Sequence, residues 1–514
     1  MDFFTRGGQP PGAAARPAVV VVHGGGWRQG DRSRFRALAY ALAARGYATA
    51  AIEYRLSGEA KYPAAVHDCN AAVRYLRANA KSLGIDPDRI AAVGGSAGGH
   101  LVGLMAAAPD VAEFQGEGGN AGVSSRIQAA VVMAGPMRLD AGPVADRSRK
   151  EPEAFANVWF GKTVDEAPAD YRNASPINHF SQQTPPLLFQ TGEFDAPTRN
   201  RESRQKLRAL SVPVGLQVYR LGTHGCWNRQ GWLPLMVDDM DRFLRQALRI
   251  RQLEPWELLS TDHFTASVDG DSLRLEVRSL PADRKLTLPR LSCPIGDVTV
   301  AGQALALKPG LDSWELTLPQ SVSTPTNIEI QLRGSALLRQ LPEVIQADGG
   351  AELPAHAATT YGTMLRYEPQ PHKNTIGYWV NQDDYAEWLV YVDEPARFSV
   401  TVFQGCGKGQ GGSQAELVAY PSDAQPPRPG NRGKATAAPE TKAAPTVEKQ
   451  RLPWEVVETG HFQNFQPVAL GELQLVTGVN VIQVRAVKKA KNAVMDIRRI
   501  QLQTLAPAAS GKSE

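Results

Sequence analysis

The residues with the clearest chemical potential are a serine, an aspartate and a histidine, in that order along the chain. Ser96 lies in the sequence Gly-Gly-Ser-Ala-Gly at 94–98, between an apolar strand-like run and a helical pattern that begins at Ala97. A Gly-x-Ser-x-Gly pattern between a strand and a helix predicts a sharp turn, from which the hydroxyl projects above the sheet. Such a serine can act as a nucleophile when a base takes its proton. The alternative is a glycine-rich turn without chemistry.

An acid and a base are expected in loops that follow later strands. Asp195 comes just after the strand predicted at Leu187–Gln190, and His224 comes just after the strand predicted at Val214–Tyr219. An open α/β sheet gathers its active-site loops at the carboxyl ends of its strands, so we expect both side chains near Ser96. His224 would then take the serine proton while Asp195 orients the imidazole.

Other titratable residues in the same part of the chain are weaker candidates for these roles. Glu193 is a rival acid, although Asp195 is better placed beyond the strand end. His67, His100 and His179 fall in a helix, at a helix start and in a connecting loop, so none is the preferred base. His23 is expected to brace its own loop.

A second glycine-rich segment predicts the groups that stabilise the oxyanion. The sequence His-Gly-Gly-Gly-Trp at 23–27 follows an apolar, β-branched strand. Glycines let the backbone approach a reacting carbonyl oxygen, and the N–H groups of Gly25, Gly26 and Ala97 are the expected donors. Trp27, at the end of this loop, is expected to contact the substrate. The chemistry needs no metal or organic cofactor.

The elements that position these residues change character along the chain. Strand-like and helix-like segments alternate through residues 17–250, which predicts βαβ units and a mostly parallel sheet with helices on both faces. Short alternating strands without helices follow, which predicts β-sandwiches. The segment at 425–450 is rich in Pro, Ala, Lys and Gly, and we expect a flexible loop there. The expected division is an α/β domain at 1–254, a β-sandwich spacer at 255–340, a second β-sandwich at 341–506 and a disordered tail at 507–514.

Composition excludes several classes of protein. The chain has 514 residues, which is enough for about three domains, and its net charge of +4 is too small to indicate binding to nucleic acid. No apolar run is long enough to predict a membrane span. The four cysteines form no Cys-x-x-Cys pair, so neither a disulfide framework nor a thiolate zinc site is indicated. The oligomeric state stays open.

Residues 17–250 resemble the α/β-hydrolase fold, in particular small esterases related to acetyl-xylan and feruloyl esterases and to hormone-sensitive lipase. The resemblance implies that Tyr54, Arg55 and Asp68 are structural. It departs at Trp227, which with Cys226 stands where a phenylalanine is more usual, and we expect Trp227 to form part of the substrate pocket wall. The matching stretches are His23–Trp27, Glu53–Leu56, Tyr62–Pro63 with Asp68, Gly84–Ile90, Gly94–His100 and Ala174–Pro176.

A further departure concerns the start of the chain. Such folds normally have two more strands before the one at Val19–Val22, and only Phe3-Phe4 would remain of them here. This suggests a truncated N-terminus with a signal peptide upstream, in which case a secreted or periplasmic protein is expected.

Residues 341–505 resemble β-sandwich carbohydrate-binding modules, in which aromatic rings stack on sugars and a structural calcium ion is common. The resemblance implies Tyr378 and Trp379 as sugar-contacting residues, with Asp348 and Asp496 as candidates for a calcium site. The alternative is that both aromatic residues lie in the core. The matching stretches are Ile376–Trp379, Asp384–Trp388, Gly471–Gly478 and Met495–Ile497.

Together these patterns predict a serine carboxylesterase that acts on a small-molecule or polysaccharide ester, with acetyl or feruloyl groups of a carbohydrate as the expected substrate. A lipid or small-ester esterase and a peptidase are alternatives, although no propeller-like repeat that would gate a peptidase site is present. A non-catalytic carbohydrate-binding surface protein with a degenerate hydrolase domain is the alternative from another class.

Overall fold

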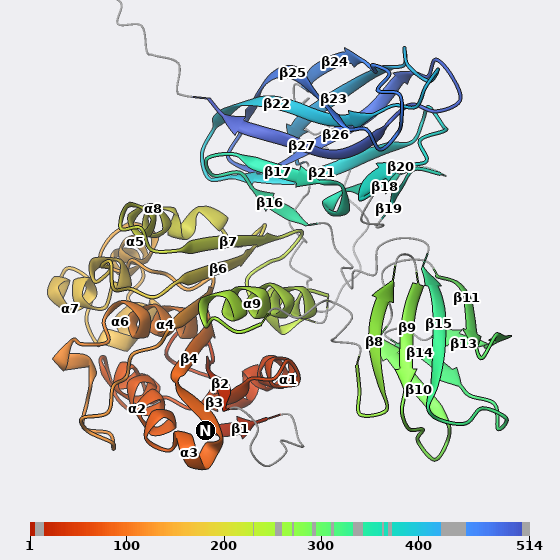
Figure 1. Cartoon of the computed structure of the whole chain (residues 1–514). Helices are drawn as coiled ribbons and strands as arrows, with labels where there is room; N and C mark the ends of the chain where they lie inside the picture. Colours follow the sequence, from red (N-terminus) through yellow and green to blue (C-terminus); the bar gives the residue numbers. More distant parts are fainter. Residues whose placement is uncertain are drawn as a thin grey trace, which may run out of the picture. The chain divides into compact units, whose positions relative to one another are not determined.

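The computed structural model divides the chain into two compact units, Met1–Gln252 and Leu253–Glu514, and each is described by itself (Figure 1). Within the residues described, no helix is long and apolar enough to cross a membrane. The structure describes residues 1–5, 15–229, 231–251, 260–269, 272–289, 295–309, 313–332, 343–361, 364–368, 373–422 and 449–505.

The first unit is built on one sheet, which has seven strands within the described residues, in the order β1-β3-β2-β4-β5-β6-β7 (Figure 1). Strand β1 runs antiparallel to β3 and every other pairing is parallel. This confirms the predicted α/β-hydrolase class, and it confirms that Phe3 and Phe4 lie in a strand. The strands are β1 Asp2–Phe4, β2 Arg16–Val22, β3 Ala48–Ile52, β4 Ile85–Gly95, β5 Ala129–Met133, β6 Leu187–Gly192 and β7 Val214–Tyr219.

Helices cover both faces of this sheet. Strands β3, β5 and β6 are buried at every residue, which requires cover on both sides. Helix α1 packs with α9, and α2 packs with α4. The helices are α1 Arg36–Ala44, α2 Ala64–Ala78, α3 Ala80–Leu83, α4 Ala97–Ala107, α5 Gly142–Lys150, α6 Phe155–Phe160, α7 Pro168–Asn173, α8 Arg201–Ala209 and α9 Leu233–Ala247.

The second unit begins with two antiparallel sheets that share a core of their own. Burial alternates along β9, where Leu273, Leu275 and Val277 face inward between exposed charged residues. This is the period-two pattern of a half-buried strand, as the sequence predicts. The sheets are β10-β14-β13 and β12-β11-β15-β9-β8. Their strands are β8 Phe264–Asp269, β9 Ser272–Val277, β10 Lys285–Pro289, β11 Ile295–Val300, β12 Gln303–Ala304, β13 Leu307–Pro309, β14 Ser313–Thr317 and β15 Thr326–Leu332.

Two further sheets form a larger sandwich around a separate core that includes Trp379, Trp388 and Phe398. One sheet is ordered β16-β21-β26-β23-β24, with β18 beside β21, and the other is ordered β19-β20-β27-β22-β25, with β17 beside β27. Their strands are β16 Val344–Gln346, β17 Ala351–Pro354, β18 Thr359–Tyr361, β19 Arg366–Glu368, β20 Thr375–Gly377, β21 Tyr385–Val392, β22 Ala396–Gly405, β23 Gln414–Pro421, β24 Gln450–Glu455, β25 Gln466–Leu475, β26 Gly478–Lys488 and β27 Asp496–Thr504.

Some predictions fall where the structure gives no description. Nearly all of the loop predicted at 425–450 and the tail predicted at 507–514 lie outside the described residues. The division of the second unit into a spacer domain and a binding module stays a prediction.

Candidate active site

Ser96 lies on the tight turn between β4 and α4. Its backbone angles, φ +55° and ψ −121°, are unusual for a residue with a side chain, and its N–H donates to the carbonyl of Met133 at 2.8 Å. The turn closes on itself, because a methyl group on Gly94 would lie 2.5 Å from the carbonyl oxygen of Gly98. Glycine at both positions therefore allows the serine to project from the end of the strand.

His224 connects Ser96 to a carboxylate. Its Nε2 lies 3.0 Å from Ser96 Oγ, and its Nδ1 lies 2.8 Å from Oδ2 and 3.0 Å from Oδ1 of Asp195. When Nδ1 donates its proton to the carboxylate, Nε2 is left to accept from the serine hydroxyl. Loops after β4, β6 and β7 thus bring together the three residues that the sequence singles out.

The carboxylate of Asp195 is almost fully buried, with 4% of the side chain exposed, whereas half of the His224 side chain is exposed.

The rival acid, Glu193, has other hydrogen-bond partners. Its carboxylate accepts a hydrogen bond from Arg220 at 2.8 Å and another from the backbone N–H of Leu221 at 2.8 Å. Glu193 therefore serves the loop after β7 and does not contact the imidazole.

The remaining histidines of the first unit hold backbone carbonyls. Nε2 of His67, His100 and His179 lies 2.7, 2.7 and 2.6 Å from the carbonyl oxygens of Glu113, Ala174 and Asn173 respectively. His23 is fully buried, and its ring stacks on Tyr54 with centroids 4.3 Å apart. These contacts hold the surrounding backbone in place.

The glycine-rich loop after β2 lies directly against the serine turn. A methyl group on Gly24 would lie 3.2 Å from Ser96 Cβ, and Gly25 and Gly26 have φ of +134° and +61°. Within the described part of the chain, no backbone carbonyl accepts from the N–H groups of Gly25, Gly26 or Ala97. These three groups are therefore available as donors beside Ser96.

Helix α6 supports this loop through two aromatic side chains that the sequence reasoning missed. A methyl group on Gly26 would lie 2.5 Å from Phe155 Cδ1, so the Phe155 ring covers that glycine. One helical turn later, Trp159 stacks on Trp27 with centroids 4.8 Å apart. Phe155 is 45% exposed, and it is the large apolar side chain of α6 that stands open to solvent beside the loop. No short motif identifies these residues, because they meet the loop only through the tertiary fold.

Arg199 is a second residue that the sequence reasoning missed. It lies in a single 3₁₀ turn, η4 (Pro197–Asn200), and Nη2 donates to Asp195 Oδ1 at 2.8 Å. Its Nη1 donates to the carbonyl of Ala134 at 2.5 Å. Asp195 lies before this turn and Ala196 has φ +48°, so the helical i, i+4 rule does not predict this ion pair.

The two tryptophans expected to contact substrate are packed inside the domain. Trp27 is 5% exposed between Trp159 and the loop, and Trp227 is 4% exposed. The Trp227 ring lies 5.1 Å from the His224 ring and against Gly95, where an added methyl group would be 2.9 Å from Cε2. Packing leaves both rings almost no free area, and their expected contact with the substrate stays a prediction. They support the serine turn, the loop and the histidine.

The two neighbouring aromatic residues of the larger sandwich differ in exposure. Trp379 is 1% exposed, and its Nε1 donates to the backbone carbonyl of Asp384 at 3.0 Å, so the expectation that it stacks on a sugar is wrong. Tyr378 is 44% exposed, with φ +58°, and the Arg366 guanidinium lies 3.6 Å from its ring centroid. The role of Tyr378 stays a prediction.

The two residues considered for a calcium site lie in different surroundings, and calcium binding there stays a prediction. Among the described residues, no group of three or more His, Cys, Asp or Glu side chains could hold a metal. Asp348 is exposed, whereas Asp496 is buried and accepts from Gln463 at 3.2 Å. Burial, and then the negative charge of Glu368, raise the pKa of Asp496 to about 7. The cation beside these carboxylates is Lys373, whose Nζ lies 2.8 Å from Glu368.

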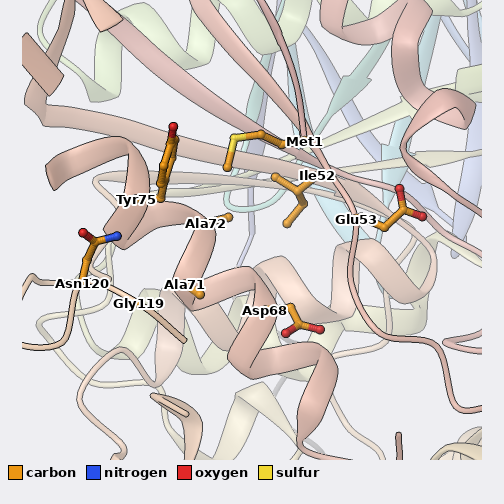
Figure 2. Close-up of a pocket in the computed structure, with 9 residues that line it drawn as sticks. All are labelled: Met1, Ile52, Glu53, Asp68, Ala71, Ala72, Tyr75, Gly119 and Asn120. Carbon is orange, nitrogen blue, oxygen red and sulfur yellow. The ribbon is translucent and has the colours of Figure 1, made fainter. Parts of the chain in front are cut away.

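A pocket of about 300 Å³ in the first unit is lined mainly by residues of β3 and α2 and by those next to them (Figure 2). Two of its carboxylates already have cationic partners, since Glu53 bonds Arg32 and Asp68 bonds Arg55. None of the candidate site residues lines it, so it is separate from the surroundings of Ser96. Its lining is Met1, Ile52, Glu53, Asp68, Ala71, Ala72, Tyr75, Gly119 and Asn120.

Comparison with known proteins points to esterases. The BD-FAE family model matches residues 9–210. Esterase LipC of Mycobacterium tuberculosis is 31% identical over 219 residues, which are 41% of this chain and 52% of LipC. The chain spans about half or less of the length of the curated relatives that it matches.

Two solved structures are similar to the first half of the chain. The propionate-bound esterase Est2 of Thermogutta terrifontis is 25% identical with a TM-score of 0.42, covering 49% of this chain and 90% of its own. A truncated carbohydrate esterase from gut microbiota is 23% identical with a TM-score of 0.42, covering 48% of this chain and 90% of its own. From its own sheet order and the match over residues 9–210, the chain carries an α/β-hydrolase domain that matches the BD-FAE esterase family.

Proposed function

We propose that the chain is a serine carboxylesterase in which Ser96 is the nucleophile, His224 is the general base and Asp195 orients the imidazole. The observation that carries the proposal is the pair of contacts made by His224, 3.0 Å to Ser96 Oγ and 2.8 Å to Asp195 Oδ2. The similarity of the chain to BD-FAE and to LipC supports the same class of reaction.

The reaction runs in two halves. The Ser96 oxygen bonds to the ester carbonyl carbon while its proton passes to His224, and the imidazolium then protonates the alkoxy oxygen as the C–O bond breaks. An alcohol leaves and the acyl group stays on Ser96. Water then gives a proton to His224 and attacks the acyl carbon, and the imidazolium returns the proton to Ser96 Oγ as its bond to that carbon breaks, which releases the carboxylic acid. Asp195 stays ionised and stabilises the imidazolium.

The backbone around Ser96 supplies the second part of the mechanism. The N–H groups of Gly25, Gly26 and Ala97 are proposed to bind the oxyanion of each tetrahedral intermediate. Ala97 opens α4, so the dipole of that helix also favours negative charge there. Losing one such donor typically lowers kcat by about 10²–10³.

The proposed substrate is an acetyl or feruloyl ester of a carbohydrate. This part rests on the sequence resemblance to acetyl-xylan and feruloyl esterases and on the β-sandwich at 341–506. Lipid or other small esters, and peptides, are alternative substrates for the same three residues. A panel of acetylated xylan, feruloylated sugars and medium-chain esters would rank these classes by kcat/KM.

The decisive experiment compares the wild-type protein with Ser96→Ala on p-nitrophenyl acetate. We expect clear hydrolysis by the wild type and a rate at least 10³-fold lower for the variant. Equal, background-level rates for both proteins would instead favour a non-catalytic protein with a degenerate hydrolase domain. The hydrogen-bonded contacts of His224 argue against that alternative.

Sugar binding by the larger sandwich is the second candidate function. Tyr378 offers a ring that is 44% exposed, and Tyr361, 39% exposed, stacks on Tyr385 with centroids 4.7 Å apart. Exposed aromatic rings are suited to stacking on apolar sugar faces. The test is binding of the full chain to insoluble polysaccharides, compared with its Tyr378→Ala and Tyr361→Ala variants. Retention that neither variant reduces would contradict this role for the two tyrosines.

A further inference from the structure

The guanidinium of Arg199 bonds two parts of the site at once. It donates to Asp195 Oδ1 at 2.8 Å through Nη2 and to the carbonyl of Ala134 at 2.5 Å through Nη1. The Asp195 side chain is 4% exposed and that of Arg199 is 29% exposed. A single, partly exposed side chain therefore bonds both the buried acid and the backbone of Ala134.

These bonds close a ring through the serine turn. Ala134 directly follows Met133, whose carbonyl accepts from the N–H of Ser96 at 2.8 Å. From Ser96 the ring continues through His224 to Asp195 and returns to Arg199. Arg199 thus links the loop that carries the acid to the backbone that holds the nucleophile.

The neighbouring side chain strengthens the same connection. Asn200 donates through Nδ2 to the carbonyl of Gly135 at 2.7 Å and accepts through Oδ1 from the N–H of Met137 at 3.1 Å. The turn that carries Arg199 is therefore bonded to residues 134–137 by two consecutive side chains. This leaves Arg199 little freedom to move away from Asp195.

The charge of Arg199 acts on the same carboxylate oxygen as the histidine. Asp195 Oδ1 lies 3.0 Å from His224 Nδ1 and 2.8 Å from Arg199 Nη2, which places the two nitrogens within about 6 Å of each other. The guanidinium and the imidazole therefore share one oxygen of the carboxylate, and Arg199 helps to fix where that oxygen lies.

The other groups around the dyad do not duplicate this effect. Glu193 is paired with Arg220 at 2.8 Å. Burial, and then the charge of Asp195, raise the pKa of the Cys226 thiol to about 12, so it stays neutral. The remaining neighbours of the imidazole are the Ser96 hydroxyl and the edge of an aromatic ring. Arg199 is thus the cation bonded directly to the Asp195–His224 pair in the described part of the chain.

We propose that Arg199 is a positioning residue that holds Asp195 in place for His224. The inference rests on the proposed roles of Ser96, His224 and Asp195. Without the guanidinium, Asp195 loses its link to the backbone of Ala134, and the imidazole loses a fixed partner.

The test is the measurement of kcat and KM for p-nitrophenyl acetate with the full chain. In Arg199→Gln, which removes the two-point fork, we expect kcat to fall about tenfold with KM unchanged. In Arg199→Lys, which keeps the charge but not the fork, we expect a kcat between those of Arg199→Gln and the wild type. Arg245→Gln is the matched control, because it removes another buried ion pair, with Asp241 at 3.0 Å in α9.

The outcomes separate this inference from the proposed function. A wild-type kcat in Arg199→Gln overturns the inference, and so does a loss that appears only in KM. An equal loss of kcat in Arg245→Gln also overturns it, because the effect would then be one of stability. Ser96→Ala, assayed in parallel, tests the proposed function alone, since its activity must disappear whether or not Arg199 positions Asp195.

Discussion

Gly26→Ala tests whether the oxyanion loop depends on its fit beneath α6. Gly26 has φ +61°, and a methyl group there would lie 2.5 Å from Phe155 Cδ1 and 2.8 Å from Cγ. Alanine in the left-handed region costs about 1–2 kcal/mol. A contact this short also forces either the ring or the loop to move. Both effects displace the N–H group proposed to bind the oxyanion.

The expected loss follows from that displacement. Removing one oxyanion donor typically costs about 10²–10³ in kcat, so we expect kcat of Gly26→Ala to fall about 100-fold. The backbone strain, at roughly 2–4 °C per kcal/mol for a unit of this size, lowers the thermal midpoint by roughly 5 °C. The double variant Gly26→Ala/Phe155→Ala removes the ring, and we expect it to recover part of kcat but not the midpoint.

Steady-state hydrolysis of p-nitrophenyl acetate and a thermal melt measure these two quantities. Gly46→Ala is the matched control, because Gly46 has φ +96° and no atom lies within 4 Å of an added methyl group. It should lower the midpoint and leave kcat unchanged. Wild-type kcat in Gly26→Ala, or an equal loss of kcat in Gly46→Ala, would refute the reasoning.

Three further predictions concern single side chains. Asp195→Asn should lower kcat by about 10³–10⁴ in steady-state assays with little change in KM, because the imidazole loses its orienting partner; a loss below tenfold would contradict this. Asp496 has its pKa raised to about 7, so its ionisation destabilises the fold as pH rises from about 4 to 7. Chemical denaturation should therefore show that Asp496→Asn raises the free energy of unfolding more at pH 8, by up to about 4 kcal/mol, than at pH 5. Burial lowers the pKa of His100 to about 4, so stability should fall as pH drops from about 6.5 to 4. Chemical denaturation should show that the free energy of unfolding falls less between pH 7 and pH 5 for His100→Asn than for the wild type. An equal fall in the two proteins would count against this explanation.

The residues brought together around Ser96 were predictable because each has a local signature. A serine between glycines, after a strand and before a helix, fixes the turn, and the sheet edge then gathers the loops that carry Asp195 and His224. The helix expected at Ala97–Ala107 and the strand expected at Val214–Tyr219 have these bounds in the structure. Here local pattern and tertiary arrangement agree.

The supporting side chains were not predictable, because their contacts depend on distant parts of the chain. Phe155 meets Gly26, and Arg199 meets Ala134, across long separations in sequence. The aromatic neighbours Tyr378 and Trp379 show a related difficulty. Adjacent residues after a strand turn to different sides, and composition does not say which side is the core. Only the structure shows that Trp379 is the buried one.

The backbone of Ser96 has a consequence for natural variation and for engineering. A residue with a side chain at φ +55° and ψ −121° adopts a conformation suited to glycine, at a cost of about 1–3 kcal/mol. We therefore expect Ser96→Gly to be more stable than Ser96→Ala by about 1 kcal/mol, after the greater freedom of glycine in the unfolded chain is counted. Selection for thermal resistance alone would favour loss of this side chain. A stabilisation campaign on this domain must therefore screen for turnover as well as melting temperature, because the most strained residue of the turn is the one proposed to form the acyl-enzyme.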